Sequence, residues 1–147
     1  MSNRDNPGIG ARFQNAVKEW FNNHFEQSFI PEVKIKIGST LTKKEDYKDH
    51  KFDIVSDDQT IAIECKCITW TQSGNVPSAK MGFVNEAAFY LSLLPNSYKK
   101  YIVILDSYNP KRDEKLADYY YKTNKHLLGD IVVAEYSPEK DEMRFLC

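Results

Sequence analysis

The sequence KFDIVSDDQTIAIECKCI occupies residues Lys51–Ile68. Two short runs with the composition of β-strands flank a polar turn, which indicates a β-hairpin. Successive side chains of a strand point to opposite faces. In the second run one face therefore carries Ile61, Ile63, Cys65 and Cys67, and the other carries Ala62, Glu64, Lys66 and Ile68.

Two acidic residues face each other across this hairpin. A loop centred on Asp58 and Gln59 sets a register in which Asp53 lies directly opposite Glu64. Like charges in this position are unfavourable by roughly 0.2–1 kcal/mol, so we expect a cation to neutralise them. Mg²⁺ is the natural candidate, because one or two carboxylates, water and phosphate oxygens suffice to hold it. Lys66 projects to the same side, which predicts a metal site with a cation beside it.

The length and composition fit one domain over residues 1–147. A chain of this size buries roughly 68–70% of its unfolded surface, and a core drawn from 41% hydrophobic residues needs no disulfides. The 20 Lys and Arg residues balance 21 Asp and Glu residues, so no global field draws the chain onto DNA or a membrane. Any nucleic-acid binding must therefore come from a local patch.

The three cysteines indicate reduced thiols in a cytoplasmic protein rather than a disulfide framework or a zinc site. Cys65 and Cys67 fall on the apolar face of one strand, where cysteine acts as a small hydrophobe. Their spacing does not suit a zinc-binding pair, and the only histidines that remain as ligands are His24, His50 and His126. The sequence has no signal-peptide pattern and no apolar run long enough to cross a bilayer, so we expect no membrane partner.

The rest of the pattern predicts alternating helices and strands. Apolar spacing, with Gly and Pro as punctuation, predicts helices at Gly8–Phe25, Lys80–Leu94 and Arg112–His126 and strands at Phe29–Ile37, Tyr101–Leu105, Asp130–Tyr136 and Glu142–Leu146. Residues 39–50 have the composition of a charged loop, and Ser78 is a candidate N-cap. The helix between the hairpin and the next strand makes those two strands parallel. We therefore expect an α/β protein with a central mixed β-sheet flanked by helices.

The spacing of Asp53 and Glu64-Cys65-Lys66 resembles the motif of the PD-(D/E)xK nuclease superfamily, which includes many restriction endonucleases and Holliday-junction resolvases. The resemblance covers most of the chain, because the common core of that superfamily is a helix, three antiparallel strands, a helix and a strand. It implies a restriction-endonuclease-like fold, with a C-terminal helix and hairpin added to this core.

The resemblance also implies the role of each motif residue. Asp53 and Glu64 would be catalytic metal ligands for Mg²⁺, with Mn²⁺ as its substitute, and the main-chain carbonyl of Cys65 would complete the coordination. Lys66 would position or activate the attacking water. A bound metal suits this chemistry, because it lowers the pKa of water and polarises the phosphoryl group.

The sequence departs from the superfamily pattern in three respects. Phe52 replaces the leading Pro of the motif, which is a common variation. Many members open with a Gly-x-x-Phe-Glu helix whose acid supports the site, whereas this chain has Gln14 in that place, four residues after Gly10. Gln14 would supply a neutral oxygen and weaken a second metal site, so the number of metals stays open. The balanced net charge is also unlike that of a strongly basic DNA clamp.

The loop after the motif is rich in Ser, Gly, Asn and Pro and would rim the cleft. Gln72 and Lys80 are candidates for contacts with phosphates or base edges. An ordinary loop followed by a helix cap explains the same residues equally well.

These observations predict a Mg²⁺-dependent nuclease that cuts DNA. We expect a homodimer, because one short domain carries one site and duplex cleavage needs two cuts. Two alternatives stay open. One is a catalytically weak or inactive nucleic-acid-binding or interaction module of the same fold, and the other is a nuclease acting on RNA or structured junctions. An exposed salt-bridge cluster is the competing interpretation of the motif itself.

Overall fold

The computed structural model describes residues 7–38 and 47–146 of the chain. The elements in chain order are α1 (Pro7–His24), β1 (Phe29–Gly38), β2 (Tyr47–Ser56), β3 (Ile61–Lys66), α2 (Ser78–Ser92), β4 (Lys99–Leu105), β5 (Tyr108–Asn109), β6 (Glu114–Lys115), α3 (Leu116–Asn124), the 3₁₀ turn η2 (Lys125–Leu127), β7 (Val132–Ser137) and β8 (Glu142–Leu146). No helix among these residues is long and apolar enough to cross a membrane. The expected charged loop over 39–46 and Cys147 lie outside the described residues.

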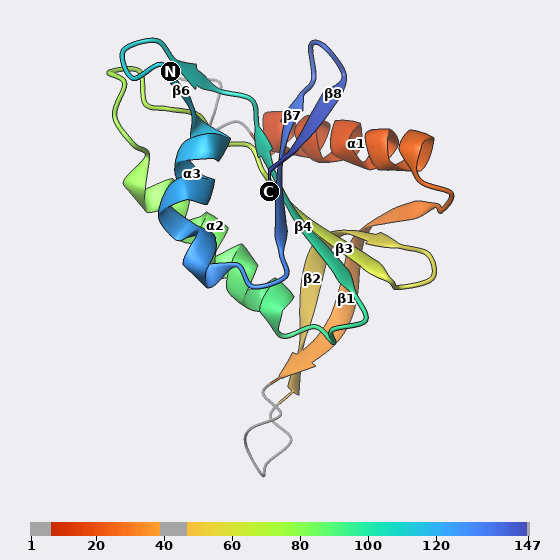
Figure 1. Cartoon of the computed structure of the whole chain (residues 1–147). Coiled ribbons are helices and arrows are strands. Elements are labelled where there is room, and N and C mark those ends of the chain that lie inside the picture. The colour runs from red at the N-terminus through yellow and green to blue at the C-terminus, as the bar shows by residue number, and fades with distance from the viewer. Residues whose placement is uncertain (1–6, 39–46, 147) are drawn as a thin grey trace.

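Six strands form one mixed sheet in the order β1-β2-β3-β4-β7-β8. β3, β4 and β7 run parallel to one another, whereas β1–β2, β2–β3 and β7–β8 are antiparallel pairs. Helix α1 lies on one face of the sheet, and α2 and α3 lie on the other (Figure 1). The predicted mixed sheet, flanking helices and parallel crossover through α2 are thus confirmed.

Two apolar cores cover the two faces of this sheet. On the α1 side, Val17 and Phe21 pack against Ile63 and Val103. On the α2 side, the predicted apolar stripe of that helix is buried against Ile102 and Ile104, and it consists of Val84, Ala87, Ala88, Leu91 and Leu94. Strand β4 is therefore covered on both faces, as its continuous apolar run predicts.

The β1–β2 hairpin changes faces at the position of Asp53. Phe52 belongs to the α2-side core, whereas Ile54, two residues on, belongs to the α1-side core. Regular alternation would place both on one face. The paired register skips Glu32 and Asp53, and Glu32 has a positive φ of 54°. The backbone is thus distorted where Asp53 turns toward β3.

Strand β2 begins at Tyr47, so the expected loop over residues 39–50 is wrong for its last four positions. These residues pair with the end of β1, from Ile35↔His50 to Gly38↔Tyr47. Three of the four are exposed, which is why their side chains carry no apolar strand pattern. Backbone pairing with the distant β1 segment overrides the local composition.

The predicted helix at Arg112–His126 begins later than expected. Residues 108–115 instead form the two-stranded β5–β6 hairpin, and α3 starts at Leu116. Asp113 has a positive φ of 48°, and its carboxylate accepts a hydrogen bond from the Tyr108 hydroxyl. These turn interactions end any helical path through the charged residues, and the backbone N–H of Leu116 donates to the carbonyl of Ser107.

Ser78 is the first residue of α2 and not its N-cap. Pro77 occupies the cap position, and no side chain caps the helix. The Pro77 carbonyl accepts the first helical hydrogen bond from Met81 N–H at 2.9 Å. The expected cap failed because the helix begins two residues earlier than the apolar stripe indicates.

Candidate functional site

Asp53 and Glu64 lie side by side in the register that the hairpin loop sets. The β2–β3 ladder pairs Ile54 with Ile63 and Val55 with Ala62, which places Asp53 and Glu64 at the next position. The two carboxyls are close enough for the charge and hydrogen bonding of Asp53 to raise the pKa of Glu64. The Asp53 side chain also contacts the next residue of β3, since its Oδ2 accepts a hydrogen bond from Cys65 N–H at 2.8 Å.

The environment of the Glu64 carboxyl favours its protonated form. Its residue is only 5% exposed. Burial first, then the charge and hydrogen bonding of Asp53, raises the pKa of Glu64 to about 9, and the nearby charge of Lys66 opposes this rise. Two carboxylates this close cannot both ionise without a compensating charge. A proton supplies that charge when no cation is present.

Lys66 supplies the positive charge on the same face of β3. Its side chain is half-buried, and its charge acts on Glu64, lowering the pKa of that carboxyl. It acts in the same sense on His50 and on the Cys65 thiol. In the described part of the chain no carboxylate forms a direct ion pair with the Lys66 ammonium.

Cys65 presents its backbone to the site and its thiol to the core. Its N–H points toward Asp53, and the N–H and C=O of one strand residue point to the same edge. The Cys65 carbonyl is thus directed to the side of the two carboxyls. The thiol packs in the α1-side core, where burial raises its pKa. Both Cys65 and Cys67 are free thiols, as predicted.

Gln14 of α1 reaches the site through its amide nitrogen. Gln14 Nε2 donates to the main-chain carbonyl of Asp53 at 3.1 Å. The contact holds the distorted backbone segment next to the Asp53 side chain. The sequence placed this residue at the site, but it predicted a role for the amide oxygen, whereas the amide nitrogen makes the contact.

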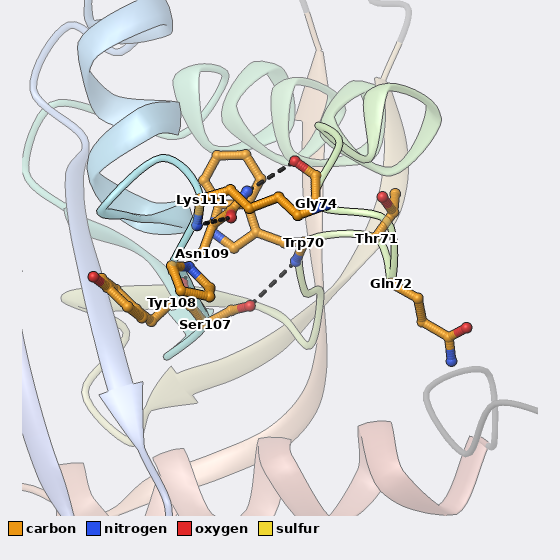
Figure 2. A pocket seen from close by; sticks show the side chains of 9 residues that line it. Trp70, Thr71, Gln72, Gly74, Ser107, Tyr108, Asn109 and Lys111 are labelled. Atoms are coloured by element: carbon orange, nitrogen blue, oxygen red, sulfur yellow. Dashed lines mark hydrogen bonds between the residues drawn. The ribbon is translucent and has the colours of Figure 1, made fainter.

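Gln72 and Lys80 lie on the loop and helix beyond β3. Gln72 is exposed and lines a surface pocket of about 240 Å³ between the loop after β3 and the loop after β4. Its side chain points away from Trp70 and Asn109 (Figure 2). Lys80 stands in the first turn of α2. Burial raises the pKa of the Cys67 thiol and the charge of Lys80 opposes this rise, so Lys80 lies near the carboxyl end of β3.

Hydrogen bonds across the two loops keep this pocket in shape. Trp70 N–H donates to the Ser107 hydroxyl at 3.1 Å, and the Asn109 amide donates to the Gly74 carbonyl at 2.8 Å (Figure 2). Gly74 has a φ of +82°, and an added Cβ would meet Asn109 and Lys111 at 3.4 Å. The loop that rims the carboxyl end of β3 is therefore fixed to its neighbour.

His50 is a neighbour of the carboxyl pair that the sequence did not place there. Its Nε2 lies 3.1 Å from Glu64 Oε1. Burial lowers the pKa of His50, and the charges of Asp53 and Glu86 oppose this shift. The missed signal was the extent of β2, because a strand that includes residue 50 brings His50 to the same hairpin as Asp53.

The donor set suits a hard cation but is incomplete. Two carboxylates and a main-chain carbonyl are oxygen donors, which Mg²⁺ and Mn²⁺ prefer. Within residues 7–38 and 47–146 no group of three or more His, Cys, Asp and Glu side chains is arranged to hold a metal ion. Water and phosphate oxygens must therefore complete any coordination shell, which is the usual situation for Mg²⁺.

No protein-family model, no curated protein and no solved structure matches this chain.

Proposed function

We propose that this chain is a Mg²⁺-dependent nuclease of the restriction-endonuclease-like, PD-(D/E)xK type that hydrolyses DNA phosphodiester bonds. The observation that carries the proposal is the buried Asp53–Glu64 carboxyl pair with the Lys66 charge beside it. The element order supports it, because α1, the antiparallel strands β1–β3, the crossover α2 and the parallel strand β4 match the core that this superfamily shares.

The chemistry follows from what each residue offers to a phosphodiester. A Mg²⁺ ion held by Asp53, Glu64 and the Cys65 carbonyl would supply positive charge to the phosphoryl oxygens and lower the pKa of the attacking water. Glu64 would release its proton to the solvent in taking this role. The Lys66 ammonium orients the attacking water and offsets the charge that develops in the transition state. Gln14 keeps the Asp53 backbone in place.

For duplex DNA we infer a homodimer. Each chain contributes one Asp53–Glu64 pair, and two strands need two cuts. Two copies related by a twofold axis would present their sites to opposite strands, which is the commonest symmetry of soluble oligomers.

The test is cleavage of supercoiled plasmid and single-stranded DNA with Mg²⁺ or with EDTA. Asp53→Ala and Lys66→Ala should each lower the rate by about 10²-fold or more, in keeping with the loss of one charge-stabilising group. Asp49→Ala is the matched control, because Asp49 is an exposed acid on the same strand. Equal rates in the wild type and in both site variants would overturn the proposal.

A second candidate is a non-catalytic nucleic-acid-binding module of the same fold. It is favoured by Gln14, whose amide nitrogen is engaged with the backbone at the place where related nucleases carry an acid. Calorimetry with Mn²⁺ separates the two, since the module would bind DNA without binding the metal. Adding RNA and branched-junction substrates to the same cleavage assay shows whether the nuclease acts on one of these substrates and not on duplex DNA.

A further inference from the structure

The ring of His50 is held on three sides. It stacks on Tyr90 of α2 with ring centroids 3.8 Å apart and an interplanar angle of 11°. Phe52, which is fully buried, meets it edge-on at 4.6 Å and 79°. The third contact is the carboxyl of Glu64, with Nε2 at 3.1 Å from Oε1. The two aromatic contacts fix the plane of the imidazole, and this plane aims Nε2 at Glu64.

We propose that His50 is a positioning residue whose Nε2–H holds Oε1 of Glu64 and leaves Oε2 to face a divalent cation shared with Asp53. This inference rests on the proposed function, since it concerns the same carboxyl pair. A carboxylate with one oxygen committed to an N–H donor has one oxygen left for a metal. Hydrogen bonds of this kind, from residues that do not touch the metal, orient its ligands.

Histidine suits this task better than a cationic side chain. A neutral imidazole offers one N–H donor and no charge, so it fixes the carboxylate without competing with a cation for it. Lysine or arginine at this position would neutralise Glu64 and weaken metal binding. Lys66 supplies the permanent charge near Glu64, which leaves orientation as the contribution of His50.

The position of His50 on β2 gives the contact its rigidity. His50 pairs with Ile35 in the β1–β2 ladder, and Ile35 packs against the α2-side core. The imidazole, which β2 carries, thus links α2 and β3 through its contacts with Tyr90 and Glu64. Glu64 is held from β2 by two groups, the carboxyl of Asp53 and the imidazole of His50.

Two variants separate the N–H donor from the ring. His50→Phe keeps an aromatic ring to stack on Tyr90 but has no N–H. His50→Gln loses the ring but keeps an amide N–H at a similar reach. Calorimetry with MnCl₂, on the full chain at pH 7.5 without DNA, measures metal affinity independently of catalysis. His50→Phe should weaken Mn²⁺ binding by about 10-fold to 100-fold, whereas His50→Gln should stay within about threefold of the wild type, because its N–H is retained.

Each outcome of the calorimetry decides something. Equal Mn²⁺ affinity in the wild type and in His50→Phe overturns the positioning role while leaving the proposed function intact. Equal losses in both variants show that the ring matters and not the N–H, which also overturns it. A wild-type protein that binds no Mn²⁺ overturns the metal site itself and the nuclease proposal with it.

A measurement on the wild type covers the case in which His50→Phe does not fold. Long-range ¹⁵N NMR of the histidine rings with saturating MgCl₂ reports which nitrogen carries the proton. The proposal predicts the Nε2–H tautomer for His50. A proton on Nδ1 alone would overturn it, because Nε2 would then have nothing to donate to Glu64.

Discussion

The proton on Glu64 should make the free energy of unfolding of the metal-free protein depend on pH between pH 7 and pH 8.5. The folded protein keeps this proton up to a pKa of about 9, whereas the unfolded chain loses it near the usual value of 4.5. Between these values the folded state binds one more proton than the unfolded state. The free energy of unfolding therefore falls as the pH rises, by about 1.4 kcal/mol for each pH unit.

Over this window the expected loss is about 2 kcal/mol, which is a sizeable part of the stability of a domain. The window also avoids His50. Burial lowers its pKa below the usual 6.5, so its folded state binds fewer protons and its effect, a rise in stability with pH, is confined to more acidic solution. Burial raises the pKa of the Cys65 thiol above its usual 9.0, so its effect on the free energy of unfolding falls at a higher pH than this window.

The assay is urea unfolding in EDTA for the wild type and for Glu64→Gln. Glutamine is nearly isosteric with glutamate but does not titrate, so the variant should lose most of the pH dependence. Saturating Mg²⁺ should abolish the loss in the wild type, because the metal displaces the proton and binds only the folded state. Identical pH slopes for the two proteins without metal would contradict this prediction, since Glu64 would then be ionised in the folded protein.

Three further predictions concern the loop, the first helix and the α2-side core. Gly74→Ala should destabilise the protein by about 1 kcal/mol, because its φ of +82° is unfavourable for alanine. Gly82→Ala lies within α2, where nothing would contact the added Cβ, and should stabilise the protein by roughly 0.4–1 kcal/mol. Thermal unfolding measures both effects. Gln14→Glu should lower the metal-free stability and strengthen Mn²⁺ binding, because it replaces the N–H donor to the Asp53 carbonyl with a carboxylate; unchanged calorimetry would argue against a supporting role. Tyr120→Phe should cost about 1 kcal/mol in urea unfolding, because the buried hydroxyl donates to an amide oxygen at 2.9 Å.

The carboxyl pair could be predicted from sequence because two local rules agree there. Strand alternation assigned the faces of β3, and the length of the Asp58–Gln59 loop set the register, so Asp53 and Glu64 were placed together without any tertiary information. The crossover through α2 followed from the order of elements. These are properties of contiguous segments, which sequence patterns describe well.

The rest of the site depends on contacts between segments far apart in the chain. His50 reaches Glu64 only because residues 47–50 pair with β1, and their polar composition resembles that of a loop. The face change at Asp53 comes from a backbone distortion opposite Glu32. The atom by which Gln14 contacts Asp53 depends on how α1 packs on the sheet. None of these is encoded in a local periodicity.

Anomalous diffraction from crystals soaked in MnCl₂ locates the metal without reference to activity. We predict a manganese peak between the carboxylates of Asp53 and Glu64, on the side to which the Cys65 carbonyl points, and no such peak in Asp53→Ala crystals. A manganese position away from this pair, or an equal peak in the variant, would contradict the proposed metal site.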